Sequence, residues 1–327
     1  MKQHMRVTLQ KSSKVKVNNM EYKHTPVLLE ETIDGLNINP NKIYVDCTLG
    51  RGGHSSEILK RLDKGHLYCF DQDEQAIKES RERLEAISNS FTLINDNFVN
   101  LKKRLNELGI NKIDGCLFDL GVSSAQFDES DRGFSYRFDA RLDMRMNQKN
   151  DLSAYEVVNS YPLKKITEII RNYGEEPFAY NIANAIVKKR SEKPIETTLE
   201  LVDVIKSALP KKVLSKPGHP AKQTFQAIRI EVNNELGVLE NALKDAVELL
   251  NSKGRIAVIT FNSLEDRIVK QFFKSLTQVE STSRYLPPVE QEINYVLVNK
   301  KVIVASEEEL ERNNRAKPAK LRILERI

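Results

Sequence analysis

The stretch Ile43-Tyr-Val-Asp-Cys-Thr-Leu-Gly-Arg-Gly-Gly-His54 decides the fold. It begins with a short apolar run that predicts a buried strand, and then breaks into Gly50, Gly52 and Gly53. Residues 55–62 follow with apolar side chains at helical spacing. A strand, a glycine turn and a helix in this order let a ligand approach bare backbone. The stretch therefore predicts a ligand-binding turn after the first strand.

Three interpretations of this turn are open. The dinucleotide motif G-x-G-x-x-G could use Gly50 and Gly52, but Ser55 occupies the place of its third glycine. The pattern D-x-T-x-G-x-G, which starts at Asp46, resembles the D/E-x-G-x-G-x-G loop of S-adenosylmethionine-dependent methyltransferases, with Thr48 replacing one glycine. A glycine turn without a ligand is the third possibility. The turn alone does not choose among them.

The chain that follows alternates strands with helices. Strands are predicted at residues 65–70, 91–94 and 113–118, and helices at 73–86 and 101–108. This alternation predicts an α/β fold with a mostly parallel, doubly wound sheet. Ligands bind such sheets at the carboxyl ends of the strands, where Asp71, Phe98 and Asp119 follow the three later strands. Four strand ends, the glycine turn included, thus predict one site.

The alternation stops after Asp119 and resumes near the C-terminus. The segment 121–150 is polar, with interleaved aromatics and arginines. Apolar residues then have helical spacing at 153–209 and in a longer helical pattern at 223–250. Strand patterns follow at 255–261, 279–286 and 293–304. We therefore expect a Rossmann-like domain at 22–125 and 222–327, interrupted by an inserted helical domain at 126–221. A basic arm at 1–21 is expected to be unstructured.

Composition limits the classes of protein that this chain can belong to. The chain has 327 residues, a net charge of +5 and a pI near 8.9, which permits a nucleic-acid partner. No apolar run approaches the ~18 residues of a membrane span. Cys47, Cys69 and Cys116 lie in strand-like runs, and the histidines are scattered without zinc-ligand spacing. We expect a cytoplasmic protein with reduced cysteines, no membrane segment and no metal site.

Eight ordered motifs carry a resemblance to a known family. They are His24-Thr-Pro-Val-Leu-Leu29, Gly50-Arg-Gly-Gly-His54, Asp119-Leu-Gly-Val-Ser-Ser124, Arg132-Gly-Phe-Ser135, Leu142-Asp-Met-Arg-Met146, Tyr173-Gly-Glu-Glu176, Thr224-Phe-Gln-Ala-Ile-Arg229 and Ser263-Leu-Glu-Asp-Arg-Ile268. With Arg315-Ala-Lys-Pro-Ala-Lys-Leu-Arg322, they resemble the bacterial ribosomal RNA small-subunit methyltransferase H family, once called the MraW proteins. The resemblance runs from about Tyr22 to the end of the chain.

This resemblance implies a methyltransferase-type Rossmann fold with an inserted helical substrate domain. It implies methylation of the N4 amine of a cytidine in the decoding region of small-subunit (16S) ribosomal RNA, free or in a 30S-type particle. In the family, the positions that match Gly52, Gly53, His54, Asp71, Phe98, Asp119 and Gln126 bind S-adenosylmethionine. Family members generally have His where this chain has Asn262, which keeps a catalytically idle RNA-binding factor open as an alternative. A nicotinamide dehydrogenase is disfavoured by Ser55.

Candidate catalytic residues follow from the chemistry of an amine. Cytosine N4 is a poor nucleophile, so a methylating site must align it with the methyl group and accept hydrogen bonds from it. Asp119 can serve the cofactor, the amine or both, and Ser123 and Ser124 are candidate acceptors or an ordinary turn.

Candidate RNA contacts lie in the polar segment and the inserted domain. Arginines there offer charge for phosphates, and Phe127, Tyr136 and Phe138 offer aromatic faces for unstacked bases. The candidates are Arg132, Arg137, Arg141 and Arg145, with Lys188, Lys189, Arg190, Lys211, Lys212 and Lys222 adding charge. A surface loop and a solvated charged face are the alternatives.

Overall fold

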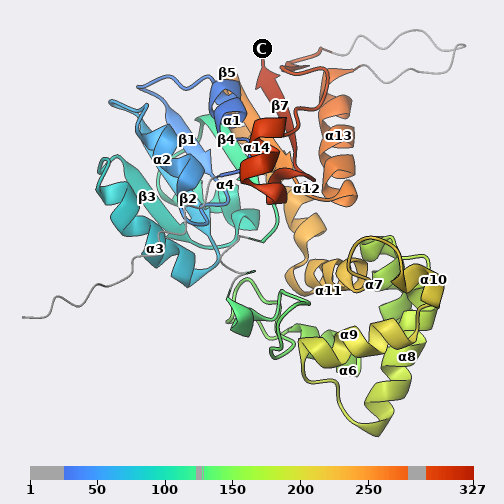
Figure 1. Ribbon diagram of the computed structural model, residues 1–327. Coiled ribbons are helices and arrows are strands. Elements are labelled where there is room, and N and C mark those ends of the chain that lie inside the picture. Colours follow the sequence, from blue (N-terminus) through green and yellow to red (C-terminus); the bar gives the residue numbers. More distant parts are fainter. Residues whose placement is uncertain (1–25, 123–126, 128, 279–291) are drawn as a thin grey trace, which may run out of the picture.

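Seven strands form one sheet that starts from the quoted stretch (Figure 1). The computed structural model describes residues 26–122, 127, 129–278 and 292–327. The strands are β1 (Ile43–Asp46), β2 (His66–Asp71), β3 (Phe91–Asn95), β4 (Ile113–Asp119), β5 (Leu250–Thr260), β6 (Tyr295–Leu297) and β7 (Lys320–Arg326). All four strands predicted between residues 43 and 119 are confirmed.

The strand order fixes where a ligand can bind. The order is β3-β2-β1-β4-β5-β7-β6, with β1 to β5 parallel and β7 antiparallel to both of its neighbours. The chain winds outward from β1 to β3 and then returns to β4 on the other side of β1. Adjacent β1 and β4 therefore form the topological switch point, beyond whose carboxyl ends a crevice opens.

Helices cover both faces of the sheet, as a doubly wound fold requires. Side chains along β4 alternate between the two layers: Cys116 and Phe118 pack on one face and Leu117 on the other. The first layer contains α4 (Leu101–Glu107), α12 (Glu235–Leu249) and α13 (Ser263–Thr277), and the second contains α1 (Leu29–Leu36), α2 (Gly53–Leu59) and α3 (Glu74–Glu85). The strands are apolar on both faces because both are buried.

A separate helical lobe lies beside the sheet lobe, shown in green to yellow in Figure 1. It contains α6 (Ala154–Ser160), α7 (Leu163–Gly174), α8 (Ala179–Glu192), α9 (Thr198–Ser207), α10 (Lys211–Leu214) and α11 (Lys222–Asn233). Ser153 and Thr197 begin α6 and α9 with capping boxes. The lobe has its own core, in which Ile170, Ile182 and Ile205 are fully buried.

Two sequence expectations about this lobe differ from the structure. The helical pattern at 223–250 is two helices, because Asn234 adopts the left-handed conformation (φ 48°) and ends α11 before α12 begins. Asparagine tolerates this conformation better than most residues. Phe225 and Ile228 of α11 are buried in the helical core, which therefore extends past the boundary expected at residue 221. Asn234 thus joins the two lobes.

The C-terminal strands of the sheet differ from the expected ones in two ways: one expected strand is shorter, and one strand was not expected. The strand pattern at 293–304 yields only β6 and an isolated bridge between Ile303 and Leu321. β7 was not predicted, although Leu321 and Ile323 alternate with charged residues there. The expected arm at 1–21 and strand at 279–286 lie outside the described residues. Within the described ranges, no helix combines the length and apolar character needed to cross a membrane.

Candidate functional site

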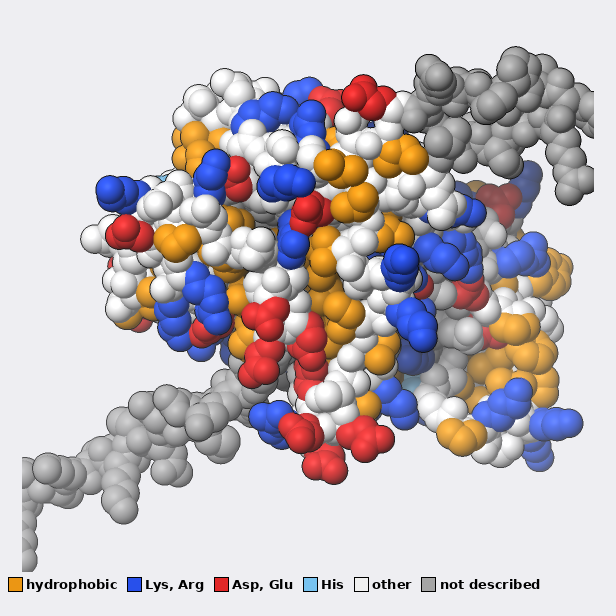
Figure 2. All heavy atoms as spheres, turned by 90° about the horizontal axis from the view of Figure 1, so that it is seen from above, with side chains coloured by type: hydrophobic (Ala, Val, Ile, Leu, Met, Phe, Trp, Pro, Cys, Tyr) orange, Lys and Arg blue, Asp and Glu red, His pale blue; other side chains and the backbone are white. Residues whose placement is uncertain are grey.

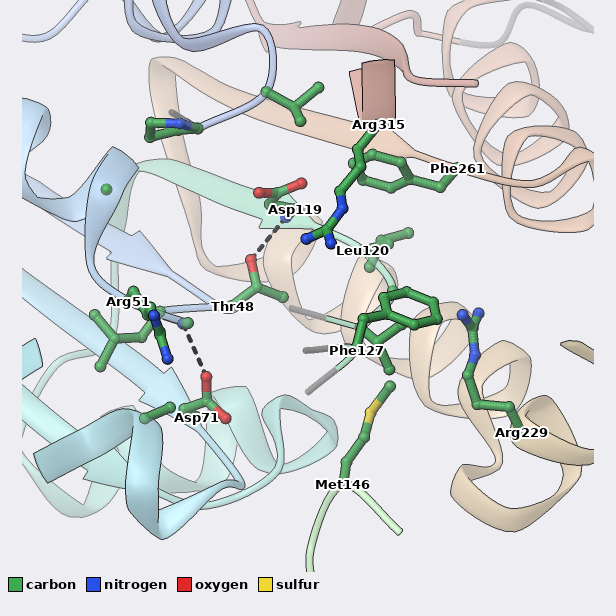
Figure 3. A pocket seen from close by; sticks show the side chains of 18 of the residues that line it. Thr48, Arg51, Asp71, Asp119, Leu120, Phe127, Met146, Arg229, Phe261 and Arg315 are labelled. Carbon is green, nitrogen blue, oxygen red and sulfur yellow. Dashed lines mark hydrogen bonds between the residues drawn. The ribbon is translucent and has the colours of Figure 1, made fainter. Parts of the chain in front are cut away.

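A cavity of about 700 Å³ opens at the switch point, where the sequence predicts the site (Figure 3). Gly53, His54, Asp71, Phe98 and Asp119 all line it. The structure therefore brings together the strand-end residues that the sequence singled out.

The glycine turn is held open by backbone conformations that favour glycine. Gly50 and Gly52 have φ of 50° and 72°, in the left-handed region. A Cβ on Gly53 would lie 2.3 Å from Cγ of Pro26, so only glycine fits there without displacement. Gly52 is not among the described residues that line the cavity, and its amide donates to the Leu49 carbonyl at 2.7 Å. The structure thus gives Gly52 a conformational role in the turn, and its contact with the cofactor stays a prediction.

Asp71 links the glycine turn to the end of β2. Its Oδ2 accepts the Gly50 amide at 2.9 Å, and its Oδ1 accepts the Asp73 amide at 2.8 Å. Burial raises the pKa of Asp71 to about 7, while these two amide bonds lower it. A carboxylate that lines the cavity at this position can accept hydrogen bonds from ribose hydroxyls.

Asp119 and His54 face each other across the switch point. His54 is buried, its Nε2 lies 3.1 Å from the Val27 carbonyl, and its Nδ1 lies 3.5 Å from Asp119 Oδ2. A carbonyl only accepts, so Nε2 carries the hydrogen. Burial lowers the pKa of His54 to about 4, and Nδ1 therefore presents a lone pair to Asp119 at neutral pH.

The carboxyl of Asp119 is poised to carry a proton. Burial, with a smaller contribution from the carboxylates of Asp46 and Glu265, raises its pKa to about 8. Its Oδ1 is buried without a hydrogen-bond partner among the described residues. A protonated Asp119 facing the lone pair of His54 explains why two such groups can lie together without an ion pair. The cavity therefore contains a carboxyl with a transferable proton.

Thr48 and Asp46 hold the two strand ends in register. Thr48 Oγ1 accepts the amide of Asp119 at 2.7 Å, which ties the loop after β1 to the end of β4. Asp46 is 1% exposed and accepts the Thr48 amide at 3.0 Å and the Ser55 hydroxyl at 2.6 Å. The acid of the sequence pattern thus orders the loop. Thr48 was noted only as a departure from the pattern, and its link to Asp119 was missed.

The far wall of the cavity comes from outside the strand ends. The polar segment and α11 contribute Phe127, Tyr136, Arg137, Phe138, Met146, Lys222 and Arg229, and the segment before β7 contributes Asn314, Arg315 and Pro318. Phe138 is 51% exposed although it lines the cavity. Phe98 lies at the sheet side, edge-on to Phe118 at 5.7 Å between ring centroids. The cavity is thus shared between the two lobes.

Two of the four candidate RNA-binding arginines have structural roles. The Arg132 side chain is 8% exposed; its Nη1 donates to Asp73 Oδ2 at 2.8 Å and its Nη2 to the carbonyls of Arg145 and Met146 at 3.0 Å. Arg145 donates from Nε and Nη2 to Asp143 and from Nη1 to the Asn150 carbonyl. These guanidinium groups are engaged within the protein, and RNA contact by them stays a prediction.

The other candidates are distributed differently. Arg137 and Arg141 are exposed, and Arg137 lines the cavity. Arg190 donates to the carbonyls of Val158 and Tyr161 at 2.6 Å, so it too is structural. The lysines at 188, 189, 211, 212 and 222 are exposed, and the last of these lines the cavity. Ser123, Ser124 and Gln126 lie outside the described residues.

Asn262 has a clear structural role. Its Oδ1 accepts the amides of Leu264 and Glu265 at 3.0 Å, and its own backbone amide donates to Glu265 Oε2 at 3.3 Å. This is the capping box that begins α13. Asn262 does not line the cavity, so it gives no support to a catalytically idle protein.

Comparisons with known proteins agree over nearly the whole chain. The ribosomal RNA small subunit methyltransferase H of Exiguobacterium sibiricum is 54% identical over 308 residues, which cover 94% of this chain and 99% of that protein. Proteins of the same name from Clostridioides difficile and Streptococcus dysgalactiae are 52% and 53% identical, each over 94% of this chain and over 100% and 98% of their own lengths. The profile of the MraW methylase family matches residues 21–327. The chain therefore belongs to the MraW methylase family.

Proposed function

We infer that the chain transfers a methyl group from S-adenosylmethionine to small-subunit ribosomal RNA, and we propose the N4 amine of a cytidine as the acceptor. One observation carries this inference: in a member of this family, a single cavity joins the loop after β1, the carboxyl of Asp119 and the helical lobe. We further propose that the RNA is bound free or in a 30S-type particle, in the cytoplasm.

The sheet side of the cavity fits the methyl donor. Gly50 and Gly53 expose backbone there, Asp71 can accept the ribose hydroxyls, and Phe98 can pack against the adenine. The cavity volume of about 700 Å³ lies within the range of ~300–1,000 Å³ that is typical of ligand pockets. When bound, S-adenosylmethionine supplies a methyl group on a positively charged sulfur that departs as a neutral thioether.

The helical side of the cavity fits the acceptor base. Enzymes that modify a base take it out of its stack, and RNA-binding sites hold such bases on aromatic faces. Phe138 offers an exposed ring in the cavity wall, and Arg137 beside it offers a charge for phosphate. The polar segment therefore presents both groups to a flipped cytidine.

Asp119 is proposed to accept a proton from the amine. Its carboxyl must first release to solvent the proton that it holds at neutral pH; until then that proton faces the lone pair of His54 Nδ1, which lies 3.5 Å from Oδ2. The ionised carboxylate then accepts a hydrogen bond from N4, stabilises the positive charge that develops there, and takes the proton as the N4–methyl bond forms.

Labelled methyl donor and small-subunit RNA or particles test this function. We expect incorporation into RNA and, by mass spectrometry of digested RNA, one modified cytidine. Asp119→Asn should lower kcat by at least about 100-fold, because a neutral amide can accept a hydrogen bond but not a proton. Asp63→Asn, which removes an exposed carboxylate that does not line the cavity, is the matched control. Methyl transfer to protein or DNA but not to RNA would overturn the proposal.

A further inference from the structure

The side chain of Arg315 enters the active-site cavity from a segment far from the strand ends. In Figure 3 its guanidinium points into the cavity on the side of Asp119 and Leu120. Arg315 is also an exposed residue. A residue that is exposed and also lines the cavity lies at the mouth of the cavity. A nucleic acid that places one base inside the cavity has its backbone near this mouth.

The segment that carries Arg315 is firmly attached to the sheet lobe. The side chain of Asn313 accepts the Arg315 amide at 3.2 Å, and Ala316 is fully buried in the sheet core. The preceding helix α14 (Glu307–Arg312) is anchored by Glu309, whose Oε1 accepts the Leu28 amide at 2.8 Å. The position of the Arg315 backbone is therefore set by the fold, which is what a residue that positions a substrate requires.

Basic side chains stand on both sides of the cavity mouth. Across from Arg315, the helical lobe contributes Arg137, Lys222 and Arg229 to the lining. Arg229 already forms two hydrogen bonds with Glu235, at 2.8 and 2.9 Å, whereas Arg137 and Lys222 are exposed. Figure 2 shows further lysines and arginines on another face of the molecule, together with acidic side chains. The basic side chains at the cavity mouth favour a polyanion there.

We propose that Arg315 binds a backbone phosphate of the nucleotide that is methylated, and thereby seats the base against Asp119. This proposal rests on the function proposed above. A planar guanidinium forms two parallel hydrogen bonds with phosphate oxygens, which fixes orientation as well as position. The glycine turn and Asp71, which we assign to the methyl donor, line the cavity from β1 and β2, whereas Arg315 precedes β7. Arg315 should accordingly contribute to the binding of RNA and not to the binding of S-adenosylmethionine.

Steady-state kinetics of Arg315→Gln, with each substrate varied in turn, test the proposal. We expect KM for RNA to rise about tenfold at low salt, because a charge-assisted phosphate contact is lost, while KM for S-adenosylmethionine stays within about twofold. The slope of log KM against log salt should fall by about 0.7 to 0.9, the value for one phosphate contact. Arg315→Lys should keep the slope but recover only part of the affinity.

Lys317→Gln is the matched control, since Lys317 is an exposed cation two residues away that does not line the cavity. An unchanged KM for RNA in Arg315→Gln, a loss confined to S-adenosylmethionine, or an equal loss in Lys317→Gln would each overturn the proposal. If the unaltered protein transfers no methyl group to RNA, the proposed function fails instead. Equilibrium binding of the same RNA to the unaltered protein and Arg315→Gln then decides the role of Arg315, and equal affinities would refute it.

Discussion

Replacing Asp119 by Asn should stabilise the protein while it removes activity, and the gain should depend on pH. Burial raises the pKa of Asp119 from 3.8 to about 8. Between these values the folded protein holds a proton that the unfolded chain has lost, so the free energy of unfolding falls as pH rises. Asparagine has nearly the same shape and does not ionise. The substitution therefore removes the loss of folding free energy that comes from ionising a buried carboxyl. This loss is absent at low pH and fully developed above pH 8.

The size of the effect follows from the shift. Each pKa unit corresponds to about 1.4 kcal/mol, and integration from pH 5 to pH 8 gives an upper value of about 3.5 kcal/mol. The side chain is 25% exposed, and its charge is partly solvated. We therefore expect the stability difference between Asp119→Asn and the unaltered protein to grow by about 2 to 3 kcal/mol over this range. In a protein of this size that corresponds to about 3 to 4 °C in Tm.

Thermal unfolding of both proteins at pH 5 and pH 8 measures this difference. Titrating groups that do not interact with Asp119 contribute equally to both proteins and cancel in the comparison. Asp63→Asn, an exposed position, should show no pH-dependent gain. A gain of equal size at both pH values, or a variant that is less stable at pH 8, would refute the assignment of a proton to Asp119.

Four further predictions follow from the site. Arg132→Ala should lower the free energy of unfolding by about 3 kcal/mol in denaturant titrations, because it breaks a buried ion pair with the carboxylate of Asp73. Asn262→Ala should cost about 1 kcal/mol by removing the cap of α13, and Asn262→Ser should restore most of it. Arg141→Ala should weaken RNA binding most at low salt and reduce its salt dependence, as filter binding at several salt concentrations would show. Finally, kcat/KM should rise with pH with a midpoint near pH 8, as the carboxyl of Asp119 ionises; a profile that falls over this range would exclude it as the base.

The sheet and the location of the site were predictable because local patterns determine them. Strand and helix periods recur along residues 43–119, and parallel winding sends every strand end to one edge. Asp71, Phe98 and Asp119 could therefore be placed together without coordinates, and they do line one cavity. The tie between Thr48 and Asp119 was not predictable, since it depends on the spacing of two strands that are adjacent only after folding.

The arginines show where prediction from sequence ends. Arg132 and Arg137 lie five positions apart in the same polar segment, yet one is enclosed by Asp73 and two carbonyls and the other faces the cavity. Both residues are arginines with similar polar and aromatic neighbours in the sequence, and only the path of the folded chain gives them different environments. Arg315 was quoted in a motif but was not predicted as a site residue, because only folding brings it to the cavity that Asp119, 196 positions earlier in the chain, also lines.

The hydrogen bond from the Asp119 amide to Thr48 Oγ1 has a kinetic consequence. The loop that we assign to the methyl donor and the residue that we assign to the acceptor share this 2.7 Å contact, so a shift of one displaces the other. Affinities for the two substrates should therefore be coupled, and by thermodynamic reciprocity each should change the other by the same factor. In double-reciprocal plots of initial rates with both substrates varied, this coupling would appear as lines that intersect above or below the horizontal axis. Thr48→Val would remove the coupling between the two affinities.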